Sequence, residues 1–291
     1  MIQSGNMINI RPMTITDLRL GLKLTQQAGW NQTESDWQRF IDLQPTGCFV
    51  AELDGSGVGT TTTCILGQVA WIAMVLVDVN ARGRGVGTRL LEHSLSYLKQ
   101  RKVKTVRLDA TPAGQPIYAK LGFQPEYELA RFEGILPRRR RPEPVEGPEP
   151  AVAKATPEIF ADIIEFDNRM TGTDRTKMLT RLFEEFPENI RFLRHGDKID
   201  GYATVRPGAN ALQVGPCIAT ALAGPPLLGD ALSRCAGEPV FVDIPLHNAA
   251  AAGIAESRGL QIQRCFMRMY HGEEVKDNVE TLWASSGPEK G

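Results

Sequence analysis

The stretch Val69–Thr88, VAWIAMVLVDVNARGRGVGT, decides the fold. Its first part, Trp71–Val77, is an unbroken apolar run that is typical of a buried strand. Its last part, Arg82–Thr88, is rich in glycine, and the segment that follows, Thr88–Lys102, has leucines at helical spacing. The sequence therefore predicts a buried strand, a glycine-rich turn and an amphipathic helix in direct succession.

The glycine-rich turn has the features of an anion-binding site. Glycines let backbone N–H groups approach an anion, and the start of a helix adds a partial positive charge. Arg82 and Arg84 can neutralise further negative charge. Glycines can also serve only to turn the chain, but three alternating glycines with two arginines exceed what a turn requires. The spacing Gly-x-Gly-x-Gly matches neither the dinucleotide-binding fingerprint nor the nucleotide-triphosphate P-loop.

Strand and helix signals alternate on both sides of this turn. We expect strands at 8–11, 48–53, 58–66 and 106–110, and helices at 16–28, 33–43 and 116–121. Such alternation predicts a mixed α/β fold, in which a central mixed sheet is flanked by helices.

Length and composition indicate two domains. The chain has 291 residues, of which 42% are hydrophobic and 23% are charged, so each half can bury a core. Residues 137–150, PRRRRPEPVEGPEP, combine prolines with charges of both signs and predict a semi-extended linker. We expect domains at 1–136 and 151–291.

Several classes of function are disfavoured. Lys and Arg total 33 against 34 Asp and Glu, so the chain lacks the basic excess of proteins that coat nucleic acids or acidic membranes. The apolar run Val69–Val77 is about half the length of a membrane-spanning helix, and no secretory signal is visible. The cysteines and histidines are scattered, which predicts reduced thiols, no metal site and a cytoplasmic protein.

Two motifs resemble those of the GNAT acetyltransferases. Strand Met74–Val77 followed by Arg82-x-x-Gly85-x-Gly87 looks like the family's Gln/Arg-x-x-Gly-x-Gly/Ala motif. About 30 residues later, Ile117–Phe123, IYAKLGF, is similar to the family's leucine-tyrosine-x-x-x-glycine-phenylalanine landmark. Two motifs in this order are far more specific than either one alone, and the resemblance covers about residues 7–134.

The resemblance implies an acetyl-CoA site where two parallel strands splay apart. Tyr118 would lie near the thioester sulfur and protonate the departing thiolate, although a tyrosine in a short helix can also be a packing residue. The strand backbone would pair with the pantetheine arm, and the turn would hold the pyrophosphate. The cofactor-binding residues implied are Met74, Val75, Leu76, Val77, Arg82, Gly83, Arg84, Gly85, Val86, Gly87, Thr88 and Thr111.

The chain departs from the family pattern at two positions. Trp71–Val77 holds no carboxylate that could act as general base, so the base stays unassigned. Thr111 stands where the family often has asparagine, seven residues before the tyrosine.

The second half repeats the layout of the first without its chemistry. An offset of 137 residues maps Thr111 onto Asn248 and Tyr118 onto Ala255, which has no proton to give. The glycine-rich turn is missing as well. The resemblance therefore extends to tandem GNAT proteins with a degenerate second domain, which either helps to form the acceptor pocket or only stabilises the first domain.

The acceptor side is expected near 29–37, between the first two helices. Trp30, Asn31 and Gln32 are the candidate residues, although Trp30 and Trp37 can also be core residues. Thr33 is a plausible N-cap, with Asp36 as the partner in an imperfect capping box. An aromatic wall with amides suits the amine of a small molecule or a peptide. We expect direct acetyl transfer from acetyl-CoA to that amine, and the alternative is a non-catalytic acyl-CoA-binding sensor.

Overall fold

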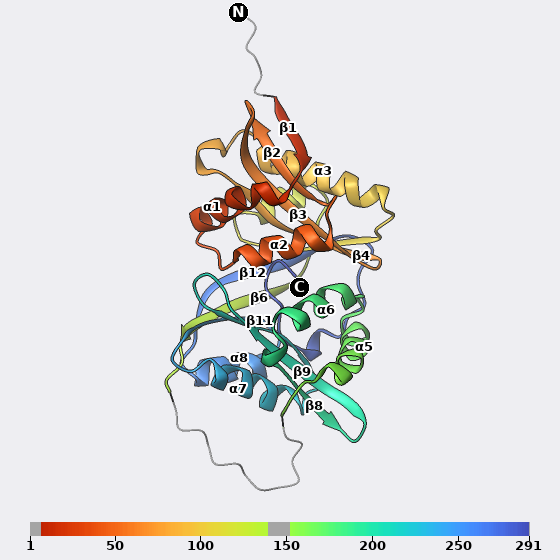
Figure 1. Cartoon of the computed structure of the whole chain (residues 1–291), viewed down its shortest axis with the longest axis vertical. Helices are drawn as coiled ribbons and strands as arrows, with labels where there is room; N and C mark the ends of the chain where they lie inside the picture. Colours follow the sequence, from red (N-terminus) through yellow and green to blue (C-terminus); the bar gives the residue numbers. More distant parts are fainter. Residues whose placement is uncertain (1–6, 139–151, 291) are drawn as a thin grey trace, which may run out of the picture.

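A single mixed sheet runs through the computed structural model, which describes residues 7–138 and 152–290. The sheet has 13 strands, and 12 of them follow the order β1-β2-β3-β4-β5-β12-β6-β11-β10-β9-β8-β7, while β13 pairs with β10. Helices cover both faces (Figure 1). The predicted mixed α/β class is confirmed.

The first half forms one end of the sheet. Its strands are β1 (Ile8–Pro12), β2 (Cys48–Leu53), β3 (Ser56–Leu66), β4 (Val69–Val77) and β5 (Thr105–Ala110). The neighbours in this series are antiparallel except for β4 and β5, which are parallel. Its helices are α1 (Leu18–Ala28), α2 (Glu34–Leu43), α3 (Val86–Gln100) and α4 (Gln115–Lys120), with short 3-10 turns η1 (Ile15–Asp17) and η2 (Val79–Ala81).

The second half repeats this arrangement. Its strands are β7 (Ala153–Lys154), β8 (Ile190–His195), β9 (Lys198–Arg206), β10 (Leu212–Ala219), β11 (Pro239–Pro245) and β13 (Leu282–Ala284). Its helices are α5 (Phe160–Thr171), α6 (Thr176–Glu185), α7 (Gly224–Arg234) and α8 (Ala249–Ser257), with 3-10 turns η3 (Pro157–Ile159), η4 (Pro187–Asn189) and η5 (Val279–Thr281). Here β10 and β11 are the parallel pair.

The two halves exchange their long strands β6 (Gln124–Ile135) and β12 (Gln261–Gly272). Strand β12 of the second half pairs with β5 of the first, and β6 of the first half pairs with β11 of the second. The two exchanged strands also pair with each other at the centre of the molecule. Neither sheet half is complete without a strand from the other, which the sequence did not predict. Most of the expected linker, residues 139–150, lies outside the described residues.

The helices on one face share a continuous core. Trp37 of α2 and Leu24 of α1 belong to the same buried cluster as Phe166 of α5 and Phe183 of α6. Helix α2 begins with the predicted capping box, because Thr33 Oγ1 accepts from the backbone N–H of Asp36 at 3.3 Å. On the opposite face of the first half, α3 packs over β2, β3 and β4. Within the described ranges, no helix is both long and apolar enough to cross a membrane.

Candidate functional site

The glycine-rich turn leads from β4 into α3. Gly85 is the N-cap of α3 with φ of 79°, and Gly83 has φ of 76°, a conformation that favours glycine. A Cβ at either glycine would meet no heavy atom within 4 Å, so the space beside both backbones is open. Arg82 and Arg84 are exposed, and Arg82 Nε donates to the carbonyl oxygen of Val77 at 3.2 Å. The turn therefore presents backbone N–H groups, a helix start and two cations to an open surface.

Asp78, the residue that follows β4, fixes the turn to α1. Its carboxylate accepts from Asn80 N at 3.0 Å and pairs with Lys23 Nζ of α1 at 2.7 Å. The bond from Lys23 lowers the pKa of Asp78 to about 2. Because both oxygens have these structural partners, Asp78 holds α1 and the turn together and is poorly suited to act as a base.

Strands β4 and β5 separate after a short parallel contact. They pair only through Val69, Ala70 and Trp71 of β4. Beyond this point β4 carries a bulge against β3, since Thr60 pairs with Leu76 and Thr62 pairs with Ala73. Met74, in the bulge, has φ of 51°. The strands thus open a wedge beside the part of β4 that leads into the glycine-rich turn.

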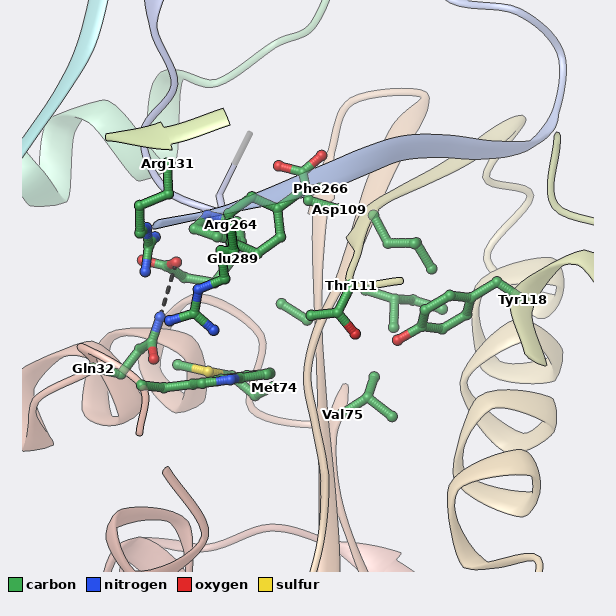
Figure 2. Close-up of a pocket in the computed structure, with 15 residues that line it drawn as sticks. Gln32, Met74, Val75, Asp109, Thr111, Tyr118, Arg131, Arg264, Phe266 and Glu289 are labelled. Atoms are coloured by element: carbon green, nitrogen blue, oxygen red, sulfur yellow. Dashed lines mark hydrogen bonds between the residues drawn. The ribbon is translucent and has the colours of Figure 1, made fainter. Parts of the chain in front are cut away.

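A pocket extends from this wedge (Figure 2). Its volume is about 490 Å³ when the space at its opening to solvent is included. Tyr118 and Thr111 line one end, while Gln32 and Glu289 line the other. The remaining lining residues are Trp30, Ile72, Ala73, Met74, Val75, Leu108, Asp109, Arg131, Arg264, Phe266 and Pro288.

Tyr118 points its hydroxyl group into the pocket (Figure 2). Its ring packs edge-on against Phe123, with ring centroids 5.8 Å apart. A Cβ on Gly114 would lie 2.8 Å from Cε2 of this ring, so the glycine makes room for the tyrosine. Burial raises the pKa of Tyr118 to about 12, and the hydroxyl keeps its proton at neutral pH.

Two of the three expected acceptor residues line the pocket, and the third does not. Trp30 and Gln32 line the pocket, but Asn31 is buried outside it. Asn31 Oδ1 accepts from the backbone N–H groups of Asn210 and Ala211, and its Nδ2 donates to Ala211 O at 3.0 Å. Asn31 therefore ties the first half to the loop between β9 and β10 rather than facing an acceptor.

Some of the expected cofactor-binding residues also line the pocket, and others lie outside it. Met74, Val75 and Thr111 line the pocket, while Leu76 and Val77 continue β4 beyond it toward the turn. Val86 is buried in the core beneath the start of α3, so its contribution to the surface is limited to its backbone.

Nine lining residues were not expected from the sequence, and three of them, Ile72, Ala73 and Leu108, are apolar residues of β4 and β5. Of the other six, Asp109 comes from β5, and five come from the exchanged strands or the C-terminal tail, namely Arg131, Arg264, Phe266, Pro288 and Glu289. Each carboxylate among them is held by an arginine. Asp109 accepts from Arg268 at 2.8 and 3.0 Å, and Glu289 accepts from Arg206 Nη2 at 2.6 Å.

The C-terminal tail, residues 285–290, is buried between the two halves. Glu289 Oε2 accepts from Gln32 Nε2 at 3.1 Å, and Lys290 Nζ pairs with both Glu289 and Asp36. Burial raises the pKa of Asp36 and Glu289, but the charges of Lys290 and Arg206 outweigh that effect and leave both values lowered. The tail thus locks one wall of the pocket through a buried ion network.

The second half has an equivalent wedge that its own chain fills. Strands β10 and β11 pair from Leu212 to Val214, after which β13 pairs with β10, and Ser285 N donates to Asp243 O of β11 at 2.8 Å. At the start of α7, a Cβ on Gly224 would lie 1.8 Å from Trp283, so the tryptophan packs directly on that turn. Ala255 is fully buried where the first half has Tyr118. The second wedge has no room for a cofactor.

Both cysteines of the first half are unsuited to covalent catalysis. Burial raises the pKa of Cys48 to about 12 and that of Cys64 to about 11, so both stay protonated thiols. Across residues 7–138 and 152–290, no cluster of three His, Cys, Asp or Glu residues could hold a metal ion.

Comparison with known proteins gives two family matches on one chain. Residues 18–123 match the acetyltransferase (GNAT) family model, and residues 163–284 match an acetyltransferase (GNAT) domain model. A holothin acyltransferase from Pseudoalteromonas sp. is 24% identical over 265 residues, which are 90% of this chain and 87% of that protein.

Solved structures share the whole fold. A putative acetyltransferase from Pyrococcus horikoshii superposes with a TM-score of 0.80 at 24% identity and covers 100% of this chain and 98% of its own. A tandem GNAT protein from the clavulanic acid biosynthesis pathway gives a TM-score of 0.63 at 14% identity, covering 93% of this chain and 100% of its own. The two-copy architecture is therefore shared with other proteins.

Proposed function

The chain belongs to the GNAT acetyltransferase family as a tandem protein of two GNAT domains, and we propose that its first domain transfers an acetyl group directly from acetyl-CoA to a primary amine. The acceptor is the amine of a small molecule or a peptide. One observation carries the proposal. The Tyr118 hydroxyl and the strand wedge line one pocket, and β4 leads from that wedge into the glycine-rich turn, whereas the matching wedge of the second domain is filled by β13.

The residues present fit acetyl-CoA. The open flanks of Gly83 and Gly85 leave room for a pyrophosphate against the N–H groups of 82–88, with Arg82 and Arg84 beside it. The backbone of Met74–Val77 has lost its β5 partner and can pair with the pantetheine amides. Bound there, acetyl-CoA supplies the activated acetyl thioester.

Tyr118 is the proposed acid. Its raised pKa keeps the phenol protonated, so it can donate its proton to the CoA thiolate as that group departs. A backbone N–H near Leu76 or Val77 stabilises the carbonyl oxygen as negative charge develops on it.

Among the residues that the structure describes, no carboxylate lining the pocket is free to deprotonate the amine. Asp109 and Glu289 line the cavity, but Arg268 and Arg206 engage them as buried ion pairs. We infer that the amine reacts after losing its proton to water. kcat/KM should therefore rise with pH up to the pKa of the acceptor amine. It should not fall again below about pH 10, because Tyr118 titrates near 12.

The test is Tyr118→Phe, followed by CoA release from acetyl-CoA with a panel of amines. We expect kcat to fall by about 100-fold or more while the Kd for acetyl-CoA stays unchanged. Tyr270→Phe is the matched control, because that hydroxyl bonds to Gln124 away from the pocket. Unchanged turnover in Tyr118→Phe would remove Tyr118 from the chemistry, and tight acetyl-CoA binding without turnover on any amine would favour the sensor.

A further inference from the structure

Two arginines lie opposite each other on the exchanged strands at the acceptor end of the pocket. In the register of β6 and β12, Arg131 pairs with Arg264, and on the other side of β6 Arg131 pairs with Asp243. Like charges in directly opposed positions destabilise a sheet. A sequence selected only for stability has no reason to retain the second arginine.

Only one of the two arginines is neutralised. Arg131 Nε and Nη2 donate to the two oxygens of Asp243 at 2.7 and 2.8 Å. For Arg264, no carboxylate of the described residues lies within ion-pair distance, and its recorded hydrogen bond goes from Nε to Gln263 Oε1 at 3.0 Å. Burial and the charge of Arg131 lower the pKa of Arg264, so the surroundings disfavour its charged form.

The charges of the pocket therefore do not cancel. Asp109, Glu289 and Arg131 each form an ion pair. Among the described residues, Arg264 forms none. The side chain of Arg264 extends into the cavity toward Gln32 (Figure 2). Phe266 supports both guanidinium groups, with its ring centroid 5.4 Å from Arg131 Cζ and 5.7 Å from Arg264 Cζ.

Gln32 supplies an independent observation at the same place. Gln32 is 7% exposed, and among the described residues its Oε1 has no hydrogen-bond donor. The amide orientation is fixed, because Nε2 donates to Glu289 and an oxygen facing that carboxylate would be repelled. A buried acceptor without a partner costs free energy unless a ligand satisfies it.

We propose that the acceptor amine carries an anionic group, a carboxylate or a phosphate, which Arg264 binds while Gln32 Oε1 accepts a hydrogen bond from an N–H or O–H of the same molecule. This inference rests on the proposed function and names its substrate class. It also gives the second domain a role in selectivity, because Arg264 belongs to β12.

The first experiment measures anion binding without turnover. Sodium phosphate and sodium acetate are titrated into the CoA-loaded full chain at constant ionic strength, for wild type, Arg264→Gln, Arg264→Lys and Arg258→Gln. Arg258, which donates to Ser233 at the surface, is the matched control. We expect Arg264→Gln to weaken binding of the preferred anion by about tenfold to a hundredfold, and Arg264→Lys to weaken it less. The two salts distinguish a carboxylate from a phosphate.

The second experiment compares amines that differ only in the anion. L-alanine is set against L-alaninamide, and glucosamine 6-phosphate against glucosamine. The anionic member of one pair should have the higher kcat/KM, and that preference should disappear in Arg264→Gln alone. Arg264→Gln should keep or gain thermal stability, because it removes the repulsion with Arg131, so lost selectivity cannot be ascribed to unfolding.

The outcomes separate the two proposals. Equal anion affinity in wild type and Arg264→Gln, or no detectable anion binding, overturns the inference even where neutral amines are acetylated. Loss of anion binding in Arg264→Gln supports the inference. If anion binding is lost in this variant but the wild type acetylates no amine, the result counts against the proposed function and not against the inference.

Discussion

Gly85 meets two requirements at once, a left-handed backbone and an open approach to it. Its φ of 79° caps α3, and its missing Cβ leaves room beside the N–H groups of the first turn. The open approach could be predicted from the sequence, because alternating glycines before a helix are typical of anion-binding turns, whereas the left-handed backbone was found only in the structure. The position of Asn31 outside the pocket could not be predicted, because its hydrogen-bond partners at 210 and 211 belong to the other half of the chain.

Gly85→Ala tests the turn. We expect weaker acetyl-CoA binding by about tenfold, because the added methyl group occupies the approach to the backbone. Gly55→Ala, with φ of 78° and equally open space in a distant hairpin, is the matched control for backbone strain. Both variants should lose about 1 kcal/mol of stability. Turnover with S-acetylpantetheine, which lacks the pyrophosphate, should be the same in wild type and Gly85→Ala, and an equal loss with both donors would contradict the assignment.

Among the elements, the wedge between β4 and β5 could be predicted from the sequence motif. The C-terminal tail that lines the pocket could not be predicted. Residues 285–290 have no periodicity, and their burial comes from charges supplied by α2 and β9, namely Asp36 and Arg206. A buried ion network depends on tertiary neighbours, so composition gives no sign of it. The same holds for β13, a strand of three residues that closes the second wedge.

Glu289→Gln tests the tail. The substitution leaves Arg206 and Lys290 short of a carboxylate, so we expect the free energy of unfolding at pH 7 to fall by about 3 kcal/mol. Because the pKa of Glu289 is held below its ordinary 4.5 in the folded state, its contribution is complete above that pH and is lost as the pH falls below it. Urea unfolding should show the difference from wild type shrinking under acid. Glu274→Gln, at an exposed position, should change little, and a pH-independent difference for Glu289→Gln would refute the electrostatic account.

For the whole molecule, the sequence predicted one fold in two copies but not the exchange of strands between them. The motifs report local structure, and β6 and β12 have similar length and pattern, so nothing in the sequence says which sheet half each one joins. The exchange explains why Arg264 and Phe266 of the second half line the pocket of the first half. It also means that deleting the second half would remove β12 from β5, so the acceptor pocket has to be tested by point substitutions.

The central claim is that the first domain holds acetyl-CoA and the second cannot, because its own C-terminal strand fills the corresponding wedge. The most direct measurement is a crystal structure of the full chain with acetyl-CoA. We expect one molecule per chain, with its pyrophosphate on the N–H groups of 82–88, its thioester beside the hydroxyl of Tyr118, and β13 still paired with β10. A cofactor bound between β10 and β11 in place of β13, or a thioester remote from Tyr118, would contradict the account.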